Sequence, residues 1–72
     1  MSRVRVSIEG VNSPWKENDM RELAGGHMIY RQGDDPRYFI EMERSEADLF
    51  VSSMRNTPGV HAKIDEGVRV YP

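Results

Sequence analysis

Apolar and polar residues alternate along the first segment of the chain, residues 3–10, whose sequence is RVRVSIEG. One side of this pattern carries Val4, Val6 and Ile8. The other side carries Arg3, Arg5 and Ser7. A period of two with β-branched residues predicts a half-buried strand, which ends where Gly10 and Asn12 follow.

The clearest helical pattern covers residues 45 to 56. Apolar residues recur there at intervals of three or four and so share one face of a helix: Ala47, Phe50, Val51 and Met54. Ser45 is a favourable N-cap, with Asp48 at the spacing of a capping box. Pro58 and Gly59 then stop the helix.

A second, less regular helix is predicted between Ser13 and the glycine pair at residues 25–26. Ser13 before Pro14 is typical of an N-cap followed by proline in the first helical position. The apolar positions form only a short stripe: Trp15, Met20, Leu23 and Ala24. The alternative is a loop with a single helical turn that starts at Asn18.

The stretch HMIYRQGDDPRYFIEME, residues 27–43, predicts two strands joined by a tight turn centred on residues 34–35. This turn places Tyr30 opposite Phe39, and cross-strand partners share a face. One face then carries Ile29, Tyr38, Ile40 and Met42. The other face carries Met28, Tyr30, Arg37, Phe39, Glu41 and Glu43. The first face is the better core because it lacks carboxylates, and a slip of one residue would exchange the two faces.

Residues 60–65, VHAKID, predict a further strand, and residues 68–71, VRVY, either pair back as a hairpin or extend that strand across a bulge. The order strand, helix, strand, strand, helix, strand predicts an α+β fold of the ferredoxin-like split βαβ type. We expect one domain over residues 1–72, with an antiparallel sheet of about four or five strands. One well-defined helix and one short or irregular helix should cover one face of that sheet.

Composition narrows the function classes. The 72 residues carry 10 basic and 12 acidic side chains, so bulk charge does not favour nucleic-acid binding. No cysteine is present, which excludes thiol chemistry and cysteine-ligated zinc. No apolar run reaches membrane-spanning length, and the first residues lack the apolar core of a signal peptide. These features predict a cytoplasmic protein that does not bind membranes.

Candidate chemistry is sparse. His27 and His61 are the only histidines, and no spacing typical of a zinc motif surrounds them. Turn formation explains Asp34 and Asp35 without a bound cation. We therefore predict no catalytic residue, no metal and no cofactor, and an enzyme is the less favoured class.

The second face of the predicted hairpin is more informative. Arg3 and Arg5 join it from the first strand, and further polar residues join it from the C-terminal segment: His61, Lys63 and either Arg69 or Tyr71. Three interpretations compete for this face. The basic side chains cover the aromatic rings and pair with Glu41 and Glu43; or the face is a protein interface, rich in aromatics, Met and Arg; or its rings stack on RNA bases.

We expect a small non-enzymatic accessory or regulatory domain, of the kind that phages and mobile elements also encode, which binds another protein or itself through this sheet face. The candidate binding residues are Met28, Tyr30, Phe39, Arg3, Arg5 and Trp15. One alternative is a homodimer that binds a small ligand, or acts as an enzyme, in a pocket between two sheets, with His61 or Arg5 contributing. The other alternative is a weak RNA-binding domain.

Overall fold

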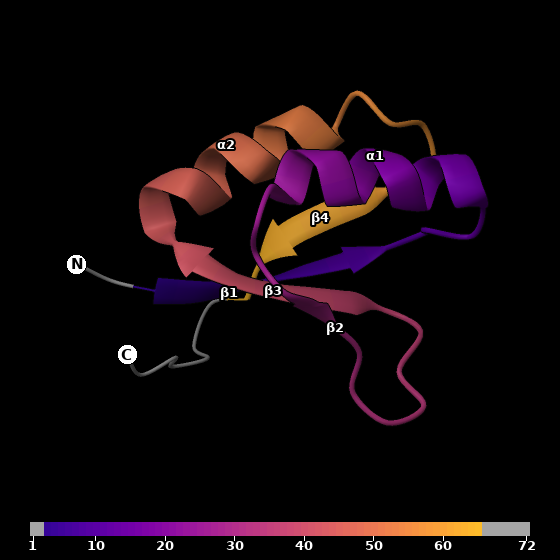
Figure 1. Cartoon of the computed structure of the whole chain (residues 1–72), viewed down its shortest axis with the longest axis horizontal. Helices are drawn as coiled ribbons and strands as arrows, with labels where there is room; N and C mark the ends of the chain where they lie inside the picture. The colour runs from indigo at the N-terminus through magenta and orange to yellow at the C-terminus, as the bar shows by residue number, and fades with distance from the viewer. Residues whose placement is uncertain (1–2, 66–72) are drawn as a thin grey trace.

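The computed structural model describes residues 3–65, an α+β arrangement of two helices on one face of an open antiparallel sheet (Figure 1). The elements in chain order are β1 (Arg3–Glu9), α1 (Pro14–Ala24), β2 (Ile29–Tyr30), β3 (Tyr38–Glu43), α2 (Arg44–Met54) and β4 (His61–Ile64). The four strands lie in the order β2-β3-β1-β4. The predicted final strand at residues 68–71, with Arg69 and Tyr71, lies outside the described residues.

The register of the hairpin is as predicted. Ile29 pairs with Ile40, and Tyr30 pairs with Phe39. The ladder between β2 and β3 is short, because β2 has only 2 residues and Pro36 in the connecting loop cannot donate a ladder hydrogen bond. On the other side of β3, Ser7 of β1 lies opposite Phe39. The sequence therefore identified correctly which residues share each face of the sheet.

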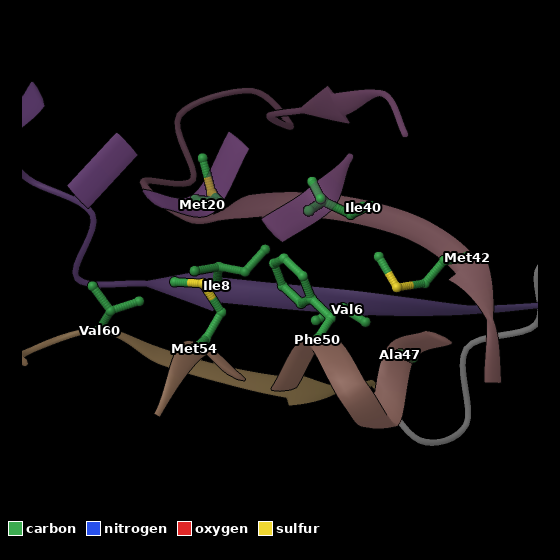
Figure 2. Close-up of a cluster of buried hydrophobic side chains, with 10 residues drawn as sticks. Val6, Ile8, Met20, Ile40, Met42, Ala47, Phe50, Met54 and Val60 are labelled. Atoms are coloured by element: carbon green, nitrogen blue, oxygen red, sulfur yellow. The ribbon is translucent and has the colours of Figure 1, made fainter. Parts of the chain in front are cut away.

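The hydrophobic core lies between the helices and the sheet, as Figure 2 shows. Its buried members come from every element except β2 and β4, with one from the loop before β4: Val6, Ile8, Met20, Ala24, Ile40, Met42, Ala47, Phe50, Met54 and Val60. The partly buried Ile29, Ala62 and Ile64 pack against this cluster from β2 and β4. The predicted core face of the hairpin is confirmed.

Helix α1 differs from the expectation of a short or irregular helix, because it has 11 residues, as many as α2. It begins as predicted, with Ser13 as N-cap and Pro14 in the first turn, and it ends before Gly25. Only Met20 and Ala24 of the predicted stripe are buried. Trp15 lies five residues before Met20, about 140° around the helix, and therefore faces away from the sheet.

Helix α2 begins earlier than predicted. Its N-cap is Glu43, the last residue of β3, so the strand runs into the helix with no loop between them. Ser45 therefore lies inside the first turn and is not the cap. The helix ends at Met54, where backbone turns take over before Gly59. Its predicted apolar stripe is confirmed, with Ala47, Phe50 and Met54 buried and Val51 half-buried.

Candidate functional site

Phe39 lies on the sheet face away from the helices, yet none of its surface is exposed. Its ring stacks against Tyr30, with the two ring centroids 5.7 Å apart. The guanidinium carbons of Arg5 and Arg37 lie 4.7 Å and 5.1 Å from its centroid. Two cations and one ring thus enclose it. The binding hypothesis required an exposed Phe39 and is wrong on this point, whereas the interpretation that basic side chains cover the ring is confirmed for Arg5.

A carboxylate far along the chain holds Arg5 in place. Arg5 Nε donates to Asp65 Oδ2 at 3.0 Å, and Ser7 Oγ donates to Asp65 Oδ1 at 3.0 Å. The Asp65 backbone N–H donates to the Arg5 carbonyl at 2.8 Å. The two charged side chains are only 19% and 11% exposed, so solvent screens this pair little. The expected pairing of Arg5 with Glu41 or Glu43 is replaced by this contact with Asp65.

Arg37 is held by a turn residue. Its Nη2 and Nε donate to the two carboxylate oxygens of Asp35 at 2.7 Å and 3.0 Å, which is a bidentate pair. These bonds and a further one from the Arg37 backbone N–H lower the pKa of Asp35 from 3.8 to about 2. The turn chemistry that joins β2 and β3 therefore also fixes Arg37 above Phe39.

The Asp35 carboxyl should accordingly titrate near pH 2 in the folded protein, well below its ordinary pKa of 3.8. Because the folded pKa is the lower one, the pair stabilises the fold fully above pH 3.8, and this contribution is lost as the pH falls toward 2. Carbon NMR of the carboxyl measures this directly. Arg37→Gln should raise the pKa toward 3.8. An ordinary pKa in the unaltered protein would contradict the pair.

A hollow of about 540 Å³ opens beside β2, and three of the predicted binding residues line it: Arg3, Met28 and Tyr30. Glu41 is also part of its lining. The Tyr30 hydroxyl donates to Glu41 Oε2 at 2.9 Å, and Arg3 Nη2 donates to the Glu41 backbone carbonyl at 3.1 Å. Burial, and then the hydrogen bond to Glu41, raise the pKa of Tyr30, so its hydroxyl remains a proton donor at neutral pH.

Met28 is the most exposed large hydrophobic residue of the described chain, at 78%. It lies at the rim of this hollow, next to the polar set formed by Arg3, Tyr30 and Glu41. Trp15 does not share this surface, because it belongs to α1 on the opposite side of the sheet. It is 53% exposed, and the Lys16 ammonium lies 5.7 Å from its ring centroid.

Sequence reasoning missed one apolar surface. Leu23 of α1 and Leu49 of α2 are 44% and 70% exposed and both line a hollow of about 300 Å³ between the helices. A signal for it existed in the sequence, because Leu49 falls outside the buried stripe of α2. A single exposed leucine is ordinary, so the surface is marked only by the contiguity of Leu49 with Leu23 along this hollow.

Residues 3–65 contain no group of three side chains able to hold a metal ion, and no helix there is long and apolar enough to cross a membrane. His27 Nε2 lies 2.8 Å from Glu46 Oε2, whereas His61 is exposed on β4 opposite Glu9. Comparison with known proteins gives no match, whether to a family model, a curated protein or a solved structure. No family is therefore assigned to the chain.

Proposed function

We propose that this chain is a small accessory or regulatory domain that binds protein, a partner or a second copy, through the hollow around Met28 and Tyr30. The observation that carries the proposal is Met28, whose flexible apolar side chain is 78% exposed beside fixed polar groups. Methionine adapts its shape to a partner, and Met, Tyr and Arg are enriched at the cores of protein interfaces.

Ring stacking and hydrogen bonds hold the side chains that form this surface, which favours binding. Tyr30 is held by its stack on Phe39 and by its bond to Glu41. Arg3 is held by the Glu41 carbonyl. Side chains already fixed before association lose less conformational entropy when a partner binds, so more of the contact energy becomes affinity.

The proposal includes a ferredoxin-like arrangement for the fold. Two observations support it: β3 lies between β1 and β2, and β1 lies between β3 and β4, so each helix connects two strands that have a third strand between them. It also includes a cytoplasmic location, which the absence of cysteine from the sequence supports.

Replacing Met28 by serine should weaken association about tenfold or more while leaving the fold intact, because Met28 contributes to binding but not to the core. Sedimentation of the purified protein measures self-association, and quantitative capture from the native host measures association with other proteins. Leu49→Ser is the matched control, since Leu49 is 70% exposed on the opposite face.

Leu49→Ser should leave unchanged the capture of those proteins that Met28→Ser loses, and any self-association that Met28→Ser weakens. If Met28→Ser sediments and captures proteins as the unaltered chain does, the hollow is not the binding surface. Circular dichroism confirms that each variant is folded.

A further inference from the structure

Helices α1 and α2 lie on the same side of the sheet (Figure 1). A groove runs along the seam between them. Two hollows of about 300 and 330 Å³ make it up, and they share Leu23 and Ser53 as lining residues. The first hollow joins the C-terminal end of α1 to the first half of α2, and the second joins the middle of α1 to the end of α2. The helices are thus antiparallel along it.

The groove has an apolar floor and two apolar lips. Phe50, Ala24 and Met42 form part of its floor and are buried in the core. The lips are Leu23, which is 44% exposed, and Leu49, which is 70% exposed. Gly25 and Gly26 close one end, where the absence of side chains leaves room for a bulky group.

The charge around this groove has one sign. Asp19 and Glu22 of α1 and Glu46 of α2 are among its lining residues, and no lysine or arginine is. Glu46 Oε2 lies 2.8 Å from His27 Nε2, and Glu22 Oε1 accepts from Asn18 Nδ2 at 3.3 Å. The C-terminal end of α1, the negative end of its helix dipole, also lies here.

We propose that this groove binds a basic amphipathic helix of a partner protein. Its apolar floor and lips match the apolar stripe of such a helix, and its carboxylates match lysines or arginines beside that stripe. The helices that form the groove have 11 residues each and are thus about 16 Å long, which about three turns of a bound helix would span. The groove and the Met28 hollow share Gly26 and His27 at their edges, but the inference rests on Leu23, Leu49 and the carboxylates of the helices, none of which lines the Met28 hollow.

The test uses three synthetic peptides of about 14 residues, long enough for about four helical turns. The first contains only leucine and lysine, with the leucines at helical spacing. The second has glutamate in place of every lysine, and the third has the composition of the first in an order without helical periodicity. Calorimetry measures affinity, and amide NMR of the labelled protein locates the binding surface.

The first peptide should bind at least about tenfold more tightly than either of the others, because only it matches both the apolar stripe and the charge. The amides that shift should include those of Leu23, Leu49 and Ser53, which line only the groove. Leu49→Ser should weaken binding about tenfold, as expected when a buried leucine is lost from an interface. Met28→Ser is the matched control and should leave it unchanged.

A double variant tests the contribution of the Asp19 and Glu22 carboxylates to binding. Asp19→Asn with Glu22→Gln should weaken binding of the lysine peptide and flatten the dependence of its affinity on salt, because screening acts only on the charge attraction.

Several results would overturn the proposal: no binding, equal affinity for the lysine and glutamate peptides, unchanged affinity after Leu49→Ser, or amide shifts confined to the sheet face. Self-association that Leu49→Ser abolishes would instead assign the groove to a second copy of the chain.

Discussion

Replacing Phe50 by alanine should lower the free energy of unfolding by about 3 to 5 kcal/mol. Phe50 is only 4% exposed and projects from α2 into the core formed with β1 and β3 (Figure 2). The substitution leaves a cavity that the surrounding side chains fill only in part. A domain of this size has a total stability of roughly 5 kcal/mol, so the variant should retain no more than about 2 kcal/mol and unfold at a much lower urea concentration than the unaltered protein.

Urea denaturation followed by circular dichroism measures this loss. Leu49→Ala is the matched control, one residue away on the same helix, and should change stability by no more than about 0.5 kcal/mol because Leu49 is exposed. A Phe50→Ala protein as stable as that control would show that α2 does not pack on the sheet through this residue.

Replacing Phe39 by serine should cost a similar amount, about 3 kcal/mol or more. The reason differs, because Phe39 lies outside the helix-side core, under Arg5, Arg37 and Tyr30. Without the ring, both guanidinium groups lose their cation–π contact and Tyr30 loses its stacking partner. The binding hypothesis assumed an exposed ring, whereas complete burial predicts that loss of the ring destabilises the fold.

Phe39→Leu provides the control for the Phe39→Ser experiment, because it keeps apolar volume under the arginines while removing the aromatic ring. It should retain more stability than Phe39→Ser, and the remaining loss measures the ring contacts. Both variants are compared by urea denaturation. If Phe39→Ser unfolds at the same urea concentration as the unaltered chain, the cover over Phe39 contributes nothing to stability.

The features that were predicted correctly from the sequence depend on residue patterns within short segments of the chain. Alternation in residues 3–10 fixed the faces of β1, and the GDDP turn fixed the pairing of Tyr30 with Phe39. The spacing of Ala47, Phe50 and Met54 defined the buried side of α2. Each of these signals lies within a few residues, where periodicity and turn chemistry act directly.

What the sequence did not predict depends on contacts between distant segments. Cover of the rings by basic side chains was one interpretation from the sequence, but the contact that holds Arg5 over Phe39 was not predicted. That contact is with Asp65, 60 positions away, and no local pattern encodes the pairing. The capping prediction at Ser45 failed because β3 passes directly into α2, so the helix starts before the residue with the best capping chemistry. The groove at Leu49 exists only once α1 and α2 lie side by side.

The most direct test of the proposed protein-binding role is photo-crosslinking from position 28 in the native host. A photoreactive amino acid in place of Met28 lies at the rim of the hollow, and the same amino acid in place of exposed Ser52 of α2 is the control. The account predicts a discrete crosslinked species from position 28, absent from position 52 and weakened by a second substitution, Tyr30→Ala. The same faint products from both positions, unchanged by Tyr30→Ala, would contradict it.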